Sequence, residues 1–215
     1  DKVKNTFRDL QLHTLIDRLK DPKITLSDSK AFLEEIEKEK NKKYFSILSI
    51  IELEKLVKEL ELASVISIDL ETDSINPVLA NIVGMSFSIK EDTGYYIPIQ
   101  CSSLKNNKMS IELVIDKMGS IFETGKYKFC GHNIKYDVLV LSKYNINLKE
   151  VYFDSMIAES LINPEKNNYS LDNLAIDYFN YKKIPFSSLF DENDKQRNMC
   201  DVPLEKISFY ASEDA

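Results

Sequence analysis

Two acids follow an apolar run near the middle of the first half of the chain. The segment Val65–Leu70 is rich in β-branched and aliphatic residues, which predicts a buried strand. Asp69 and Glu71 lie two positions apart, so their side chains point to the same face of that strand. Two carboxylates at the end of a buried strand are costly unless something compensates their charge. The pair therefore indicates a divalent-metal site or, with equal weight, a salt bridge or cap at the strand end.

Two later segments add further candidate groups. Asn133 is a natural helix N-cap, which does not exclude a functional role, and Asp137 four residues later could add a third carboxylate at the sheet edge. Tyr210 and Asp214 are also four residues apart, so in a helix they share one face. Each pair alone is more typical of a structural contact. Together, four acids and a phenol supplied by a strand end, a helix start and a late helix are what a two-metal phosphodiester hydrolase needs.

Alternating strands and helices must position these groups. The hydrophobic pattern predicts strands at 44–48, 65–70, 81–89, 94–99 and 127–130, and helices at 51–60, 109–122 and 133–144. The second, third and fourth of these strands are expected to form an antiparallel set. Helical patterns dominate from residue 153 to the end. The fold class is therefore α/β, a mixed sheet with flanking helices and a helical C-terminal half.

The first 42 residues follow a different pattern. Apolar spacing predicts one helix at 6–19 and a second at 27–40. The charged run EKEKNKK around the end of the second helix is typical of a solvated helix end or linker. We therefore expect an N-terminal helical segment or linker at 1–42 and a domain at 43–215.

Composition narrows the possible functions. The 215 residues carry a formal net charge of −7, which argues against a broad basic surface for nucleic acid but is consistent with an acidic site whose field cations invert. There are only five glycines and no glycine-rich phosphate loop, and the three cysteines lack zinc-site spacing. No apolar run approaches the roughly 20 residues of a membrane span. Because no signal peptide is seen either, we expect a cytoplasmic protein.

Three segments resemble the exonuclease motifs of the DEDDy superfamily. They are VISIDLETDSINPVLANIVGMSFSI, GHNIKYDVLVL and YASEDA, in this order and at these spacings. The chain is similar in particular to the 3'-5' exonuclease domain of bacterial family A DNA polymerases over about residues 44–215, including the intermediate segment FDSMIAESLINP. The resemblance implies a ribonuclease H-like fold. A weaker similarity links FRDLQLHTLIDRL to the tail of the 5'-nuclease region that precedes this domain in such polymerases, so the chain is expected to be an internal fragment.

The resemblance also implies an activity and a set of catalytic groups. The domain would proofread by removing nucleotides from a single-stranded or mispaired DNA 3' end, as a monomer, beside a polymerase domain of the same parent chain. Asp69, Glu71, Asp137 and Asp214 would bind two divalent cations, Mg²⁺ with Mn²⁺ as a substitute. Tyr210 would orient the attacking water.

Further residues are implied as substrate contacts. Thr72 and Ile75 would contact the terminal nucleotide, and Phe186 would pack on a base. His132 stands where the family often has glutamine, and the segment 191–195 is more acidic than the basic loop common there, which would weaken substrate binding, although Lys195 and Arg197 could contact phosphates. The complete set implied by the resemblance is Thr72, Ile75, His132, Asn133, Tyr136, Phe186 and Arg197.

Two alternatives stay open from the sequence. The same motifs serve RNase D-like enzymes that process RNA. Some polymerases also keep this fold as a catalytically inactive scaffold after losing the acids, although this chain retains all four acids and Tyr210.

Overall fold

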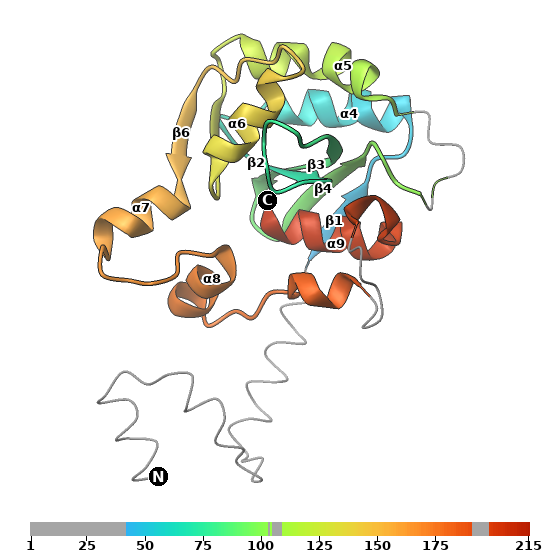
Figure 1. Cartoon of the computed structure of the whole chain (residues 1–215). Coiled ribbons are helices and arrows are strands. Elements are labelled where there is room, and N and C mark those ends of the chain that lie inside the picture. Colours follow the sequence, from blue (N-terminus) through green and yellow to red (C-terminus); the bar gives the residue numbers. More distant parts are fainter. Residues whose placement is uncertain (1–41, 103, 105–108, 191–197) are drawn as a thin grey trace, which may run out of the picture. The chain divides into compact units, whose positions relative to one another are not determined.

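A six-stranded mixed sheet organises the part of the chain that the computed structural model describes, which is residues 42–102, 104, 109–190 and 198–215 (Figure 1). The strand order is β1-β4-β3-β2-β5-β6. β3 pairs antiparallel with β2 and β4, whereas β1 is parallel to β4, and β5 is parallel to β2 and β6. The strands are β1 (Lys43–Ser46), β2 (Val65–Thr72), β3 (Ile82–Lys90), β4 (Thr93–Pro98), β5 (Lys128–Gly131) and β6 (Val151–Asp154).

Within the described residues, six α-helices and two short 3-10 turns accompany the sheet. In Figure 1, α4 and α5 lie above the sheet and α9 lies below it. The helices are α4 (Ile50–Leu60), α5 (Ile111–Glu123), α6 (Ile134–Ser142), α7 (Ser155–Ile162), α8 (Leu171–Phe179) and α9 (Leu204–Asp214), with the turns η1 (Phe186–Leu189) and η2 (Met199–Asp201). None of these described helices combines the length and apolar character that a membrane crossing requires.

The sheet separates two hydrophobic cores. Successive residues of a strand point to opposite faces. Tyr96 of β4 therefore packs with Ile207 and Ala211 of α9, whereas its neighbour Ile97 joins the larger core under α4 and α5. All four of these side chains have no exposed surface. The buried face of α9 thus fixes this helix against the sheet.

Local sequence explains the start and the buried face of α4. The Glu52 N–H donates to Ser49 Oγ (3.3 Å), and the Ser49 N–H donates to Glu52 Oε2 (2.9 Å), which is a capping box. Leu53, Leu56 and Leu60 follow at spacings of three and four and are fully buried. The helix predicted at 51–60 is confirmed by this pattern.

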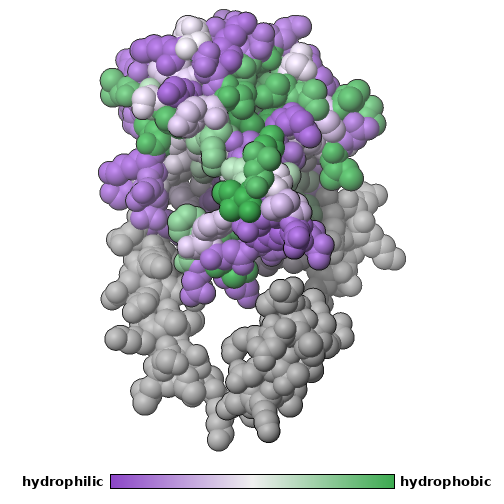
Figure 2. Space-filling view, turned by 90° about the vertical axis from the view of Figure 1, so that its left-hand side faces the viewer, coloured by the Kyte–Doolittle hydropathy of each residue, from purple (hydrophilic) through white to green (hydrophobic). Residues whose placement is uncertain are grey.

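Hydrophobic side chains remain exposed on the face that carries β6, α7 and α8, where they lie among hydrophilic ones (Figure 2). In α7, Leu161 is 77% exposed. A polar network holds α7 instead: Lys166 Nζ lies 2.6 Å from Glu159 Oε1, and the Tyr178 O–H donates to Glu159 Oε2 (2.6 Å). These contacts lower the pKa of Glu159 to about 2. The ion pair and the hydrogen bond therefore join α7 to α8 where little apolar surface is buried.

The five predicted strands and three predicted helices are present with bounds shifted by a few residues, and the antiparallel set of β2, β3 and β4 is confirmed. The C-terminal part is helical in α7, α8 and α9, but the strand β6 was missed. Val151, Tyr152 and Phe153 of β6 are all exposed, so this edge strand shows no alternation of apolar and polar residues. The two helices predicted at 6–19 and 27–40 lie outside the described residues.

Candidate active site

The C-terminal end of β2 carries the first two acids into adjoining cavities. Asp69 lines a cavity of about 340 Å³, and Glu71, only 7% exposed, lines a second cavity of about 410 Å³. The two cavities share Leu70, Asn133 and Tyr136 as lining residues. Both acids are paired with β3, and the register between the two strands shifts directly after Glu71.

The start of α6 brings Asp137 to the first cavity. Asp137 is 3% exposed and lies one turn after Asn133. Asn133 has φ 57° and ψ 36°, a left-handed conformation that asparagine tolerates, and its side chain makes no capping hydrogen bond. Asn133 is thus the N-cap residue of α6, as expected, but the side-chain hydrogen bond expected of an N-cap is absent. The Asn133 N–H instead donates to Asp154 Oδ1 (3.0 Å), which leaves the Asn133 amide group at the cavity wall.

The last helix supplies the other two groups. Tyr210 and Asp214 lie one turn apart on α9, and both line the first cavity. Ser208 Oγ lies 2.7 Å from Ser46 Oγ, so α9 is also bonded to β1. The Tyr210 ring meets Phe186 edge to face, with 6.4 Å between the ring centroids. Tertiary packing thus places this helix beside the end of β2.

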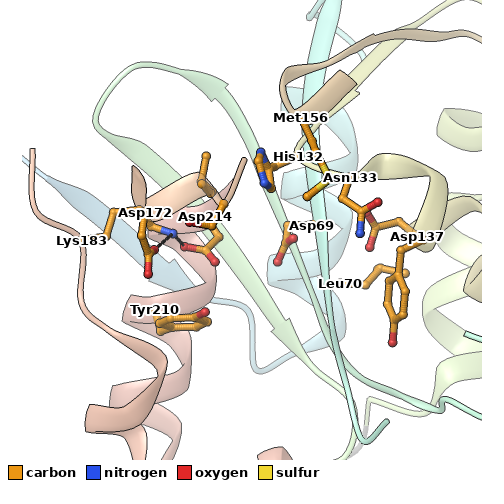
Figure 3. Close-up of a pocket in the computed structure, with 13 residues that line it drawn as sticks. Asp69, Leu70, His132, Asn133, Asp137, Met156, Asp172, Lys183, Tyr210 and Asp214 are labelled. Carbon is orange, nitrogen blue, oxygen red and sulfur yellow. Dashed lines mark ion pairs between the residues drawn. The ribbon is translucent and has the colours of Figure 1, made fainter. Parts of the chain in front are cut away.

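Figure 3 shows how these side chains lie around the cavity. Asp69 lies between Asp214 on one side and Asn133 and Asp137 on the other. The Asp214 carboxylate forms an ion pair with Lys183, a residue that no sequence motif had indicated. The structure thus brings three of the four predicted acids and Tyr210 to one cavity, with Glu71 in the adjoining one.

Burial and mutual repulsion raise the pKa values of the acids that are gathered at this site. Burial, together with the nearby Asp214 charge, raises the pKa of Asp69 to about 7. Burial, followed by the Asp69 charge, holds the pKa of Glu71 and of Asp137 well above the usual range. Burial also raises the pKa of Asp214, against the opposing effect of Lys183. A cation bound beside these buried acids would stabilise their ionised forms.

The donor set fits a hard divalent cation, although the side chains are not yet arranged around one. Four carboxylates offer only oxygen ligands, the type that Mg²⁺ and Mn²⁺ prefer. Among the described residues, no three His, Cys, Asp or Glu side chains form a ready ligand group. The ion pair of Asp214 with Lys183 engages one of the four acids. Chemistry and charge therefore fit a metal site that requires side-chain adjustment to assemble.

Four of the predicted substrate contacts fall into a hydrogen-bonded pair, Thr72 and Tyr136, and an exposed pair, Ile75 and Phe186. Thr72 Oγ1 lies 2.6 Å from Tyr136 Oη, and the Tyr136 hydroxyl also donates to the Ser74 carbonyl, so these residues brace the loop after β2. Ile75 is 99% exposed and lines the second cavity together with Phe186, which is 43% exposed. Ile75 and Phe186 therefore offer an accessible apolar and aromatic surface beside Glu71.

His132 lines the first cavity. Its Nδ1 lies 2.9 Å from Ser155 Oγ, and its Nε2 is buried without a hydrogen-bond partner among the described residues. Burial lowers the pKa of His132, so the ring is neutral near pH 7. The predicted contact Arg197 lies outside the described residues.

Sequence reasoning missed three residues at this site. Asp154 caps α7 and orients Asn133, and its position within FDSMIAESLINP was the signal that could have found it. Lys183 and Asp172 form an ion pair at the cavity wall (3.4 Å). Neither carries a local signal, because a charged residue in a polar segment predicts only a surface position.

Comparison with known proteins assigns the family. The family model for the 3'-5' exonuclease domain of family A DNA polymerases matches residues 44–215. The chain belongs to this exonuclease family. Over 177 residues it is 40% identical to the DNA polymerase I of Borreliella burgdorferi, a match that covers 81% of the chain. It spans only 18% of the length of that polymerase.

Solved structures agree with this exonuclease fold. Escherichia coli RNase D, an exoribonuclease, matches with a TM-score of 0.59 at 14% identity, over 80% of this chain and 41% of that one. Brucella melitensis NrnC with bound Mg²⁺ matches with a TM-score of 0.54 at 14% identity, over 81% of this chain and 74% of that one. These likenesses concern the fold alone, and they confirm the ribonuclease H-like architecture.

The raised acid pKa values predict how the metal-free exonuclease domain responds to pH. The pKa of Asp69 rises from 3.8 to about 7 on folding, so between these pH values the folded state binds more protons than the unfolded state. Stability in EDTA should therefore fall as the pH rises from 4 to 7. Thermal melts at pH 5 and pH 8 measure this, and added Mg²⁺ should restore stability at pH 8.

The control for this pH response is Asp69→Asn, which removes the titrating group. Its melting temperature in EDTA should depend less on pH between 5 and 8 than that of the wild type. A wild-type melting temperature that rises over this interval would contradict the prediction.

Proposed function

We propose that the chain is the proofreading domain of a DNA polymerase I, a 3'-5' exodeoxyribonuclease that acts on single-stranded or frayed 3' ends with two divalent cations. The observation that carries this proposal is the convergence of β2, α6 and α9. They bring Asp69, Asp137, Tyr210 and Asp214 to one cavity, beside a second cavity lined by Glu71. The match of the exonuclease family model to residues 44–215 supports it.

The four acids would hold the cations. When bound, these cations supply a nucleophilic water near neutral pH and stabilise the departing 3' oxygen. Asp69 lies between Asp214 and Asp137 (Figure 3), and its carboxylate would help to hold the cations. The Mg²⁺ bound in the NrnC structure of the same fold supports magnesium as the cofactor, and Mn²⁺, which accepts the same oxygen ligands, would substitute.

Tyr210 would orient the attacking water as a neutral phenol. Burial and the neighbouring Asp214 charge raise its pKa far above the usual value, so the hydroxyl keeps its proton at neutral pH. A phenol of this kind donates or accepts a hydrogen bond but does not act as a base. The role of Tyr210 is therefore positional.

The surface beside the acids would favour a nucleic-acid end whose bases are unpaired. The second cavity presents Ile75 and Phe186 as an exposed apolar and aromatic surface beside Glu71. Bases of an unpaired end can stack on such a surface, whereas paired bases remain in their duplex. Thr72, Asn133, Tyr136 and His132 would shape the remaining contacts, together with Arg197 from outside the described residues. Frayed or mispaired ends are thus the preferred substrate.

The similarity to polymerases supports DNA over RNA as the substrate in this proposal. The chain is 40% identical to a DNA polymerase I but only 14% identical to RNase D. We therefore place residues 43–215, as the exonuclease domain, in a monomeric cytoplasmic polymerase. Residues 1–42 would form a separate segment, and a polymerase domain of the same parent chain would deliver the DNA end.

Degradation of a 5'-labelled single-stranded DNA tests the proposal. The chain and its parent polymerase should each produce a ladder of products that shorten by one nucleotide from the 3' end with Mg²⁺ but not with EDTA. Asp214→Ala should abolish the ladder. Equally fast degradation of an RNA of the same sequence would favour the RNA-processing alternative. No ladder from folded, Mg²⁺-saturated wild type would favour an inactive scaffold.

Tyr210→Phe tests the positional role of the hydroxyl. The loss of one hydrogen bond to the attacking water should lower the rate of 3'-end hydrolysis by about 10- to 100-fold. Single-turnover assays measure the rate, and circular dichroism checks the fold. Tyr152→Phe on β6 is the matched control, because Tyr152 is 62% exposed and lines neither cavity. An unchanged rate for Tyr210→Phe would remove Tyr210 from the mechanism.

A further inference from the structure

A buried lysine stands at the wall of the candidate active site. The side chain of Lys183 is 4% exposed, and its ammonium group pairs with Asp214 and lies 3.4 Å from Asp172 Oδ1. The same nitrogen lies 5.7 Å from the centroid of the Tyr210 ring. A buried ammonium is costly without such partners. Lys183 is therefore held by two carboxylates and an aromatic face.

The segment that carries Lys183 is fixed to α9. The Tyr181 hydroxyl donates to Glu213 Oε1, and the Ile184 N–H donates to Glu213 Oε2 (2.8 Å). Both bonds reach the residue that directly precedes Asp214. Contacts on both sides of Lys183, one through a side chain and one through the backbone, thus hold its segment beside Asp214.

The pairing engages a carboxylate that the proposed reaction needs for metal. Asp214 is one of the four proposed ligands, and the described residues contain no ready three-ligand group while it is paired. Asp172 offers a second place for the ammonium, since its side chain is 51% exposed at the start of α8 and lies on the same cavity. Figure 3 shows Lys183 paired with both acids.

We propose that Lys183 is an internal competitor for one cation site: its ammonium occupies Asp214 in the metal-free protein and shifts to Asp172 when a divalent cation binds. This inference rests on the proposed function, because it assumes that Asp214 is a metal ligand. Competition between a fixed ammonium and a cation for one carboxylate lowers the apparent affinity of that site. The site therefore fills only at a higher cation concentration than the other acids would require.

Metal titrations of the whole chain test the competition. In Lys183→Met, which keeps the length of the side chain without its charge, we expect the weaker Mn²⁺ site to bind about tenfold more tightly, as for the loss of one charge-assisted contact. Free Mn²⁺, counted by electron paramagnetic resonance, gives the affinity without any substrate. In EDTA the variant should melt at a lower temperature than wild type, and saturating Mg²⁺ should remove that difference.

Lys182→Met is the matched control, because Lys182 is the exposed neighbour and the substitution changes the net charge equally. It should alter neither the Mn²⁺ affinity nor the melting temperature. Equal tightening by both variants would indicate a general field effect and would overturn the competition. A Lys183→Met variant that loses the same stability with and without Mg²⁺, or binds Mn²⁺ as wild type does, would also overturn it and would reduce Lys183 to a structural role.

Asp172→Asn tests the release step. Without its second partner, the ammonium should stay on Asp214, so Mn²⁺ affinity should fall in the wild-type background but not in the Lys183→Met background. An equal fall in both backgrounds would overturn the release to Asp172. If the wild type binds no Mn²⁺ or Mg²⁺ at all, the metal site of the proposed function fails together with this inference. If the wild type binds and Asp69→Asn does not, a negative Lys183 result counts against the inference alone.

Discussion

Asp69→Asn is expected to lower the rate of 3'-end hydrolysis by at least about 10³-fold, because metal-ion stabilisation of the reaction contributes several kcal/mol. Asp69 lies between Asp214 and Asp137 (Figure 3), and it is one of the four acids proposed to hold the cations. The amide keeps the shape of the side chain but removes the negative charge that binds cations. The effect should therefore come from lost metal binding and not from lost packing.

Single-turnover degradation of the labelled DNA measures this effect, with thermal melts as a check on folding. In EDTA the variant should be at least as stable as wild type near pH 8, because burial of an ionised Asp69 is unfavourable and its pKa is raised to about 7. Asp116→Asn is the matched control, since Asp116 is an exposed acid of α5 that lines neither cavity. A folded Asp69→Asn protein that retains more than about a tenth of the rate would argue against a metal-ligand role.

Gly94→Ala is expected to destabilise the domain by about 1–3 kcal/mol, the usual cost of overpacking a close contact. A β-carbon at Gly94 would lie 2.7 Å from Ser212 Cβ and 2.8 Å from the Ser212 carbonyl oxygen. The second contact involves backbone, so either β4 or α9 must move. Because Ser212 lies between Tyr210 and Asp214, the shift displaces both groups of the candidate site.

The same substitution should therefore also reduce activity in the protein that remains folded. A displacement of about 1 Å in a catalytic group can cost about 10²-fold in rate. Denaturant unfolding and single-turnover assays measure the two effects separately. Gly119→Ala is the control, since nothing lies within 4 Å of a β-carbon added there and the residue is inside α5. It should stabilise the domain by about 0.5–1 kcal/mol. Wild-type stability in Gly94→Ala would mean that α9 can shift from β4 freely.

Local periodicity was sufficient for most of the fold and for the kind of element that carries each candidate acid. The two-residue spacing of Asp69 and Glu71 on a strand, and the four-residue spacing of Tyr210 and Asp214 on a helix, follow from backbone geometry alone. Most of the predicted strands and helices bury one face in one of the two cores, whereas β3 is buried on both faces. An element that buries one face therefore shows a periodic apolar pattern in the sequence.

The strand β6 and the conformation of Asn133 depend on contacts with residues that are distant in the sequence. β6 pairs only with β5 at the sheet edge and has exposed side chains, so its formation depends on a hydrogen-bonded neighbour and not on its own pattern. Asn133 adopts a left-handed conformation, and its N–H is bound by Asp154, which lies 21 residues later. A capping rule that uses only neighbouring residues does not include Asp154.

The sequence by itself thus determined which acids and which phenol the chain offers, on which kind of element, because those features follow from residue type and short-range spacing. Only the tertiary structure decided how they meet. The Ser46–Ser208 bond and the contact of Gly94 with Ser212 each join segments more than 100 residues apart, and they set α9 against the sheet. Lys183 reaches Asp214 because Glu213 anchors its segment. The charge balance of the site therefore depends on contacts between segments that no local pattern encodes.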